Sequence, residues 1–304
     1  MSKKQTLSLL FMMNKELEKI AIDRLKAFEP KEEPYYLCYS GGKDSDCIKI
    51  LAELAGVKYE AVHNLTTVDA PETVRYIKSQ SDIKIEYPEI SMWRLIENKG
   101  MPPTRLIRYC CEELKERGGK GRVKVTGVRW YESENRKKNS GLIKILGKPK
   151  TTQKYAKQIG ADFEVSPKGG LIMNTDNDKS RRMVEHCYRT TSTMVNPIVE
   201  WTDSDVWQFL RYYGCESNPL YCEGYKRIGC IGCPLSTQQQ QQEFERYPIY
   251  KENYIKAFDR MLQKLRLKPN FNGDWKNGED VFNWWVGINP NQITLFDLME
   301  NEYE

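Results

Sequence analysis

Two patterns of hydrophobic positions alternate along the first two-thirds of the chain. Short runs rich in β-branched and aromatic residues, as expected for strands, occur at 35–39, 59–65, 84–87 and 123–128. Stretches with the apolar spacing of a helix lie between them, at 44–55, 71–79, 91–97 and 108–117. Strands that alternate with helices form a parallel sheet covered by helices. The pattern therefore predicts an α/β fold with a twisted, mostly parallel sheet.

The pattern becomes irregular between about residues 136 and 185, where turn-forming Gly-Lys and Asn-Asp pairs predict an insertion with some β content. Order returns at 196–201, and Thr202 with Asp205 is expected to cap a helix that reaches residue 213. A loop with four cysteines follows at 214–237, and then helix to about residue 268, interrupted at Pro248. We expect an α/β domain at 1–213 and a cysteine-bearing loop with a helical C-terminal region at 214–304 packed on it.

Composition narrows the class of protein. The 304 residues are 39% hydrophobic and 29% charged, and no run of about 18 apolar residues exists that could span a membrane. The apolar stretch near the N-terminus is too short for a signal peptide and continues as an amphipathic helix, so we expect a cytoplasmic protein. Only two histidines occur, which argues against a His-rich zinc hydrolase site.

Charge is distributed unevenly around the net value of +5. Residues 115–157 contain fourteen Lys and Arg against three Glu, so this segment carries +11 and the remainder of the chain −6. Such a segment is either a solvated face or a surface for an anionic partner such as nucleic acid.

The most informative stretch is Ser40-Gly41-Gly42-Lys43-Asp44-Ser45, which connects an expected buried strand to an expected helix. Two glycines allow a sharp turn and close approach of a phosphate, and the helix start offers unpaired N–H groups and a positive dipole end. The serines add hydroxyl donors, and Lys43 adds a compact positive charge. The loop is too short for the G-x-x-x-x-G-K-[ST] pattern, and it lacks the third glycine of the G-x-G-x-x-G pattern. The alternative is an ordinary glycine turn with a helix cap.

This stretch resembles the PP-loop of the adenine-nucleotide α-hydrolase superfamily, specifically of the phosphoadenosine-phosphosulfate (PAPS) reductase-like family. Three further segments resemble that family in order: Thr67-Val68-Asp69-Ala70-Pro71-Glu72-Thr73, the Thr-Gly-x-Arg segment at 126–136, and the Asn-Pro-x-x-x-Trp segment at 196–207. Together they cover about 35–234 with gaps. The resemblance implies a Rossmann-like sheet flanked by helices.

The resemblance also implies the site residues. The phosphates of ATP would be bound by Ser40, Gly41, Gly42, Lys43, Asp44 and Ser45, with further nucleotide contacts from Gly127 and Arg129. Lys43, Asp44 and Arg129 are the candidate catalytic residues, since a guanidinium binds phosphate through two parallel hydrogen bonds. The alternative for Arg129 is a surface arginine in a basic region.

Nine cysteines, two of them adjacent and two spaced as Cys-x-x-Cys with no secretory signal before them, favour metal or redox chemistry in a reducing compartment. The two pairs, Cys110 with Cys111 and Cys230 with Cys233, could supply four thiolates to a cluster or to zinc. One branch of the resembling family, the adenylyl-sulfate reductases and sulfurtransferase-like relatives, holds a [4Fe–4S] cluster on such pairs, and this implies the same cluster here. Cys222 is either a sulfur-carrying thiol or a spare loop cysteine.

One departure from the family bears on the reaction. Stand-alone reductases of the family carry a nucleophilic cysteine near the C-terminus, whereas no cysteine follows Cys233 in these 304 residues. The resemblance therefore favours the sulfurtransferase-like branch, in which ATP with Mg²⁺ adenylates an acceptor such as tRNA or DNA. Sulfur from a donor protein then displaces the adenylate. The alternatives are a PAPS or adenylyl-sulfate (APS) reductase that uses a thiol supplied elsewhere, and a non-catalytic nucleotide-sensing protein.

Overall fold

The computed structural model describes residues 3–269, 271 and 273–287, and within them no helix is long and apolar enough to cross a bilayer. The chain forms two compact units from interleaved segments. Unit 1 comprises residues 1–64, 71–86 and 117–228, and unit 2 comprises 65–70, 87–116 and 229–304. This division differs from the expected one at residue 213, because a short segment after the second strand and the segment around residues 87–116 belong with the C-terminal helices.

Unit 1 contains one eight-stranded sheet with the order β3-β2-β1-β4-β8-β5-β7-β6. The strands are β1 (Tyr35–Cys38), β2 (Tyr59–Asn64), β3 (Ile83–Glu86), β4 (Val123–Val125), β5 (Ile143–Leu146), β6 (Glu164–Val165), β7 (Leu171–Met173) and β8 (Ser192–Val195). The first four and β8 run parallel, whereas β5, β7 and β6 add antiparallel to β8 and to one another. The predicted α/β fold with a mostly parallel sheet is confirmed.

The helices of unit 1 at residues 43–55, 71–78 and 203–212 lie where the sequence pattern predicts them, whereas those at 134–139, 149–158 and 178–187 were not predicted. The helices of this unit are α1 (Lys3–Ala27), α2 (Lys43–Ala55), α3 (Pro71–Lys78), α5 (Glu134–Asn139), α6 (Pro149–Gln158), α7 (Asp178–Cys187) and α8 (Asp203–Tyr212), with short 3₁₀ turns η2 (Trp130–Glu132) and η3 (Pro219–Tyr221). Gly56 ends α2 in the left-handed region at φ 68°, which glycine adopts without strain. Thr202 caps α8 together with Asp205, as predicted.

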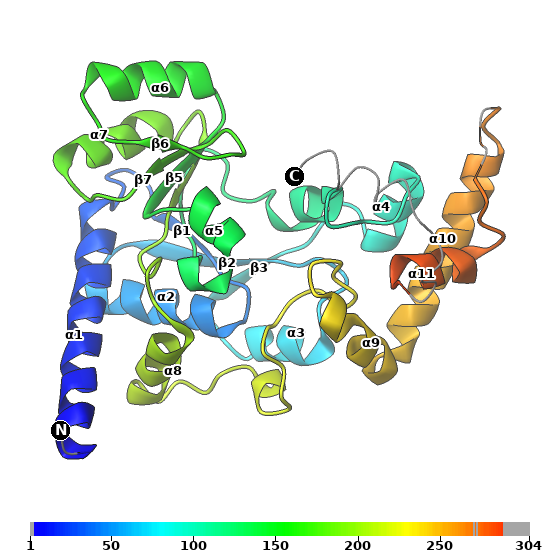
Figure 1. The fold of residues 1–304 in the computed structure, drawn as a ribbon, viewed down its shortest axis with the longest axis horizontal. Helices are drawn as coiled ribbons and strands as arrows, with labels where there is room; N and C mark the ends of the chain where they lie inside the picture. Colours follow the sequence, from blue (N-terminus) through cyan, green and yellow to red (C-terminus); the bar gives the residue numbers. More distant parts are fainter. Residues whose placement is uncertain (1–2, 270, 272, 288–304) are drawn as a thin grey trace. The chain divides into compact units, whose positions relative to one another are not determined.

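The core of unit 1 lies between the sheet and helices α1, α2 and α8. Leu37, Ile48, Leu51, Val125 and Val195 are fully buried in it. Figure 1 shows α2 running between α1 and α8, and each of these neighbours packs against it. Burial of α2 on this side fixes the direction in which its first turn leaves β1, and so the position of the glycine-rich loop between them.

The irregular region expected at about 136–185 contributes three strands to the sheet. Strands β5 and β7 are buried on their inner faces, and α6 and α7 pack beside them (Figure 1). The segment at 196–201 forms turns, and the strand that leads into it is β8. The pattern of β8, Ser-Thr-Met-Val, is short and half polar, which is why the apolar spacing did not reveal it.

Unit 2 is helical. Its elements are α4 (Met92–Lys99), a π-helical turn η1 (Cys111–Lys115), α9 (Thr237–Arg246), α10 (Pro248–Arg266) and α11 (Gly278–Trp285). Pro248 separates α9 from α10, as predicted, because its ring fits the first turn of a helix but not the interior. The helix expected at 108–117 is reduced to the π-helical turn and the residues just before it.

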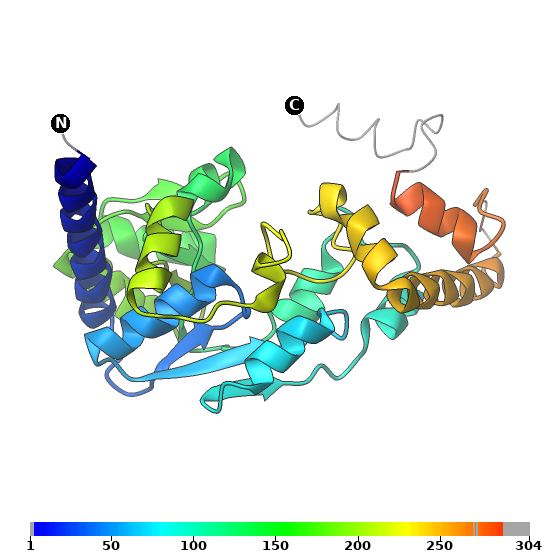
Figure 2. The same cartoon turned by 90° about the horizontal axis from the view of Figure 1, so that it is seen from below.

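Aromatic side chains form the core of unit 2. Tyr254 lies between Trp93 and Trp285, with ring centroids 4.9 and 4.7 Å away, and Phe244 and Phe258 complete the cluster. Figure 2 shows α10 and α11 against each other, and the Trp285 indole donates a hydrogen bond to the Pro103 carbonyl at 2.6 Å. The C-terminal segment is therefore packed into unit 2 as far as Trp285.

Candidate functional site

The glycine-rich loop of unit 1 connects β1 to α2. Gly41 has a φ of 73°, a value that other residues rarely adopt, and Gly42 occupies the N-cap position of α2. The Ser45 hydroxyl accepts a hydrogen bond from the Gly42 N–H at 3.1 Å and donates to the Gly42 carbonyl at 2.7 Å. Ser45 is buried and closes the loop on itself, whereas Ser40 is exposed. Of the two serines expected to face a phosphate, the structure leaves Ser40 at the surface.

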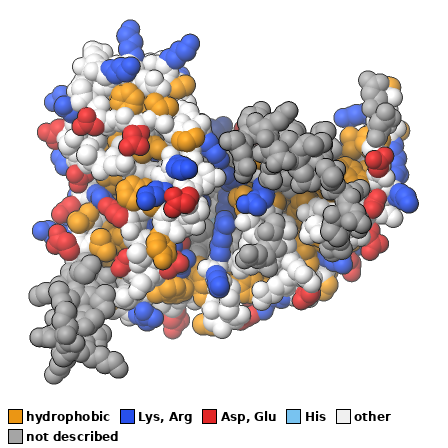
Figure 3. Space-filling view, in the orientation of Figure 1, with side chains coloured by type: hydrophobic (Ala, Val, Ile, Leu, Met, Phe, Trp, Pro, Cys, Tyr) orange, Lys and Arg blue, Asp and Glu red, His pale blue; other side chains and the backbone are white. Residues whose placement is uncertain are grey.

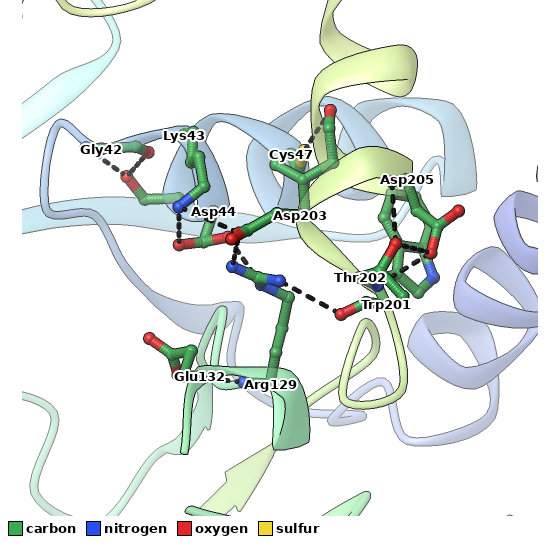
Figure 4. Close-up of polar contacts among 12 residues, drawn as sticks. Gly42, Lys43, Asp44, Cys47, Arg129, Glu132, Trp201, Thr202, Asp203 and Asp205 are labelled. Atoms are coloured by element: carbon green, nitrogen blue, oxygen red, sulfur yellow. Dashed lines mark hydrogen bonds and ion pairs between the residues drawn. The ribbon is translucent and has the colours of Figure 1, made fainter. Parts of the chain in front are cut away.

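A network of charged side chains lies beside the loop (Figure 4). Arg129, with 1% of its side chain exposed, donates to Asp44 at 2.8 Å, to Asp203 at 2.7 Å and to the Trp201 carbonyl at 3.1 Å. The Lys43 ammonium lies 3.5 Å from Asp44 and 3.4 Å from Asp203. The two predicted cationic residues are thus brought together, and both are held by the same two carboxylates.

The two carboxylates differ in their electrostatics. Burial raises the pKa of Asp44, and the positive charges of Lys43 and Arg129 only partly oppose this effect. Asp203 is more exposed, so the hydrogen bond from Arg129 and the charge of Lys43 outweigh its partial burial and lower its pKa. Asp203 is therefore a stable anion at neutral pH.

Gly127 lies directly against the loop. A Cβ at this position would come within 2.9 Å of the Asp44 Cβ and of the Asp44 backbone carbonyl oxygen. Only glycine allows the end of β4 to approach the first turn of α2 this closely. The predicted nucleotide contact at Gly127 is thus adjacent to the loop, and its absent side chain has a packing role as well.

Three residues at the loop had no assigned role in the sequence analysis. Asp203 is the first residue of α8, and Tyr221 and Asn218 come from the η3 turn. The Tyr221 hydroxyl accepts a hydrogen bond from the Lys43 N–H at 2.9 Å, and the buried Asn218 amide donates to the Gly41 carbonyl at 3.0 Å. The Asn-Pro-Leu-Tyr turn signal was visible in the sequence, but not its position beside the loop.

The four cysteines predicted as ligands all lie in unit 2. Cys110 and Cys111 stand at the start of the π-helical turn, and Cys230 and Cys233 belong to one tight turn in which the Cys233 N–H donates to the Cys230 carbonyl at 3.2 Å. Cys230 forms a β-bridge with Asp69, and its thiol lies 3.4 Å from the Thr66 hydroxyl. All nine cysteines lie in the described part of the chain, and none of them forms a disulfide.

Charges of the two cysteine pairs interact. The hydrogen bond between Cys110 and Cys111, aided by Arg108 at 3.3 Å, lowers the pKa of Cys111 to about 5 and raises that of Cys110. Cys230 and Cys233 also raise the pKa of Cys110, so the pairs lie within electrostatic reach of each other. Among the described residues, no three His, Cys, Asp or Glu side chains are arranged as they stand to hold a metal ion. The donor set has the chemistry of a thiolate site, but closing it requires the side chains to rearrange.

The basic segment at 115–157 does not form one surface. Arg129 and Lys124 are buried, Arg122 pairs with Glu60, and Lys115 belongs to unit 2. The exposed basic residues of unit 1 in this segment lie on α5, on α6, before α6 and before β4: Lys120, Arg136, Lys137, Lys138, Lys148, Lys150, Lys154 and Lys157. Figure 3 shows Lys and Arg side chains standing out over the region of α6.

Comparison with known proteins decides the family. Residues 34–236 match the model of the phosphoadenosine phosphosulfate reductase domain. The chain belongs to this family. The matched range includes the glycine-rich loop, Arg129 and all four paired cysteines. The resemblance inferred from the sequence motifs is confirmed.

Individual relatives are distant. An uncharacterized protein of Methanocaldococcus jannaschii is 25% identical over 275 residues, 87% of this chain and 54% of that protein. The chloroplastic 5′-adenylylsulfate reductase 3 of Arabidopsis thaliana is 27% identical over 294 residues, 91% of this chain and 57% of that one. The chain spans about half the length of these curated relatives. A phosphoadenylyl-sulfate reductase structure from Candida auris aligns with a TM-score of 0.41 and 16% identity, covering 76% of this chain and 96% of that one.

A buried carboxylate in the first turns of α2, directly after the glycine-rich loop, gives a test of this geometry. Asp46 is 3% exposed and accepts a hydrogen bond from the Tyr39 hydroxyl at 2.5 Å. Burial raises the pKa of Asp46 to about 6, although hydrogen bonds from Tyr39 and Tyr76 oppose the shift. The folded state therefore binds this proton more tightly than the unfolded chain does. Its contribution to stability is fully present below about pH 4 and is lost as pH rises through 6.

We expect Asp46→Asn to remove this pH dependence. Relative to the wild type, the variant should gain on the order of 2–3 kcal/mol of unfolding free energy between pH 4 and pH 7.5. Urea unfolding at several pH values measures the difference, and Asp178→Asn, at an exposed aspartate, is the matched control. A difference between variant and wild type that does not change with pH would contradict the raised pKa.

Proposed function

We propose that this protein is a PP-loop ATP-pyrophosphatase-type enzyme that adenylates an acceptor for sulfur transfer. The observation that carries the proposal is the loop at 40–45, which joins a buried strand to a helix start and has Lys43 and Arg129 beside it. ATP binding, pyrophosphate release and the acceptor are the testable parts.

The residues of the loop have separable roles in this reaction. Backbone N–H groups at the start of α2 and the Ser40 hydroxyl would bind the phosphates, and Lys43 would stabilise the charge that develops on the transferring phosphate. An oxygen of the acceptor attacks the α-phosphorus, its proton is lost, and the bond to pyrophosphate breaks. A sulfur nucleophile then displaces AMP, which leaves sulfur on the acceptor.

Magnesium would enter with ATP. Mg²⁺ in proteins is bound by one or two carboxylates together with substrate phosphates, and it neutralises phosphate charge. Asp203 fits this role best, because it is partly exposed, anionic and 3.4 Å from the Lys43 ammonium. Asp44 is the second candidate, and Arg129 holds one oxygen of each of the two carboxylates. Exchange of Lys43 from carboxylate to phosphate would release the Asp44 oxygen that Arg129 does not hold, whereas Arg129 would keep the Asp203 oxygen that Lys43 contacts.

The four paired cysteines would hold a [4Fe–4S] cluster, which would supply or activate sulfur. Support comes from their gathering in one unit and from the interaction of their charges. Arg108 and Lys115 lie near them as cations, and the charge of Cys230 raises the pKa of Lys115. Positive neighbours stabilise thiolates, the form in which cysteine binds metals.

A sulfonucleotide reductase is the second candidate. It is favoured by the match to the Arabidopsis 5′-adenylylsulfate reductase over 91% of this chain. Such a reaction would need a thiol from elsewhere, and Cys222 is an exposed cysteine next to Tyr221 at the loop. Release of sulfite from an adenylyl sulfate would identify this activity, whereas release of pyrophosphate from ATP identifies adenylation.

The acceptor that we propose is a nucleic acid, tRNA or DNA. Both α5 and α6 carry exposed lysines or arginines, and both helices belong to the same unit as the loop. A sulfur donor protein would complete the system, and the compartment that fits reduced thiols is the cytoplasm.

The first prediction concerns ATP. Purified protein with Mg²⁺ should bind ATP, and with its acceptor it should release pyrophosphate and AMP. Gly42→Val should abolish ATP binding, because a Cβ at Gly42 already lies 3.1 Å from the Tyr221 hydroxyl and 3.5 Å from the Ser40 hydroxyl. Calorimetric titration measures the affinity, and thermal unfolding shows that the variant is folded. Unchanged affinity in a folded Gly42→Val protein would refute the loop as the phosphate site.

The second prediction concerns iron. Protein purified without oxygen should be brown and contain about four iron and four acid-labile sulfide per chain. Cys230→Ser and Cys110→Ser should lose the iron, whereas Cys38→Ser, at a half-buried cysteine of unit 1, should keep it. Iron analysis and visible absorption measure both. A colourless preparation with one zinc per chain would show that the four cysteines form a structural zinc site and not a cluster site. Full iron in the Cys230→Ser variant would show that the ligands are wrong, with Cys222 the next residue to test.

The third prediction concerns the basic surface. Affinity for tRNA or DNA should fall with salt, with a log–log slope of about −0.9 per phosphate contact on duplex DNA and about −0.7 on single strands. Replacing Arg136, Lys137 and Lys138 by alanine should flatten the slope and leave ATP affinity unchanged. The matched control removes three exposed lysines elsewhere on unit 1, namely Lys19, Lys26 and Lys58. Equal effects of the two triple variants would indicate that α5 is only a solvated face.

A further inference from the structure

Tyr221 occupies an unexpected position at the glycine-rich loop. Its hydroxyl accepts the hydrogen bond of the Lys43 N–H, the first amide of α2, at 2.9 Å. Its ring packs edge-to-face against Trp207 with centroids 5.0 Å apart, and the Lys43 ammonium lies 6.0 Å from the ring centroid. The Tyr221 side chain is thus fixed at the N-terminus of α2, and the N-terminus of a helix is the end that binds anions.

Two hydroxyls border the same face of Gly42. A Cβ built on Gly42 would point at the Tyr221 hydroxyl, 3.1 Å away, and at the Ser40 hydroxyl, 3.5 Å away. Glycine leaves this space open. Together with the Lys43 ammonium, the two hydroxyls border the space that a phosphate would approach. The Ser40 hydroxyl donates to the Ser45 hydroxyl at 3.3 Å, so it would exchange this acceptor for a phosphate oxygen.

The turn that carries Tyr221 is anchored to the loop. Asn218 has no exposed surface, and its amide donates to the Gly41 carbonyl at 3.0 Å and to the Thr73 hydroxyl at 3.1 Å. Its side-chain oxygen accepts from the Leu220 N–H at 3.1 Å. Every hydrogen-bonding direction of this buried amide but one is thereby used, so the turn and the loop hold each other in a defined register.

We propose that Tyr221 is a phosphate-binding residue of the loop, whose hydroxyl accepts from the Lys43 N–H and donates its own hydrogen to a phosphate oxygen of the bound nucleotide. A phenol has one donor and can accept as well, so it can bridge an amide and an anion. Burial raises the pKa of Tyr221 well above its ordinary value, which keeps that hydrogen in place. This inference rests on the proposed function, because it takes the ligand to be a nucleotide polyphosphate.

The test compares Tyr221→Phe with the wild type in calorimetric titrations with Mg²⁺-ATP, Mg²⁺-pyrophosphate and adenosine. Removal of a hydrogen bond to a charged group should weaken ATP and pyrophosphate binding about tenfold or more. Adenosine has no phosphate, so its affinity should not change. Tyr155→Phe, at a tyrosine stacked on His186 between α6 and α7, is the matched control and should bind all three ligands as the wild type does.

Unchanged or tighter pyrophosphate binding in folded Tyr221→Phe would overturn the inference and leave the nucleotide site intact. In that case the hydroxyl only covers an amide that the nucleotide needs. A wild-type protein that binds neither ATP nor pyrophosphate would overturn the proposed function itself. If thermal unfolding shows that Tyr221→Phe does not fold, Ser40→Ala tests the same pair of hydroxyls. It should lose pyrophosphate affinity by a similar factor, and an unchanged affinity would refute the arrangement.

Discussion

A guanidinium that is almost completely removed from water must find acceptors inside the protein, and Arg129 finds three. They are the Asp44 carboxylate, the Asp203 carboxylate and the Trp201 carbonyl, contributed by the start of α2, the start of α8 and the turn before α8. A buried charge without such partners would cost several kcal/mol, so these three segments and the end of β4 are held in one arrangement. The glycine-rich loop depends on this arrangement, because Asp44 is one of its residues.

The donors of the glycine-rich loop have partners within the chain. The Gly42 N–H is satisfied by Ser45, the Lys43 N–H by Tyr221, and the Lys43 ammonium by Asp44 and Asp203. In the binding mode proposed above, the Lys43 N–H keeps the Tyr221 hydroxyl as its acceptor, and only the Lys43 ammonium exchanges a carboxylate for phosphate. Pre-organised donors cost little reorganisation when charge develops in a reaction, which suits a site for phosphoryl chemistry.

The four paired cysteines have surroundings that differ from those of the glycine-rich loop. The four that pair in the sequence lie in the helical unit, whose core is a cluster of aromatic rings. Segment 65–70 reaches this unit directly after β2, and Asp69 and Thr66 contact Cys230. Residues 65–70 of the helical unit are joined at both ends to segments of unit 1. The chain that contacts Cys230 is therefore covalently continuous with the sheet unit.

Local chemistry in the sequence determined the elements and the loop. Buried β-branched and aromatic runs, Gly56, the Thr202 cap and Pro248 specify strands and helix ends through short-range sterics and hydrogen bonds, and the Ser40–Ser45 run specifies its own turn. Only the tertiary structure decided which distant residues complete the site. Asp203 reaches the loop because α8 packs against α2, and Asn218 and Tyr221 reach it because the η3 turn packs against α3. Periodicity carries no information about such contacts. Long-range strand pairing also decided the places of β5, β6 and β7 in the sheet, because these strands are too short for their hydrophobic pattern to identify them. The division of the chain into two interleaved units likewise depends on contacts between distant segments.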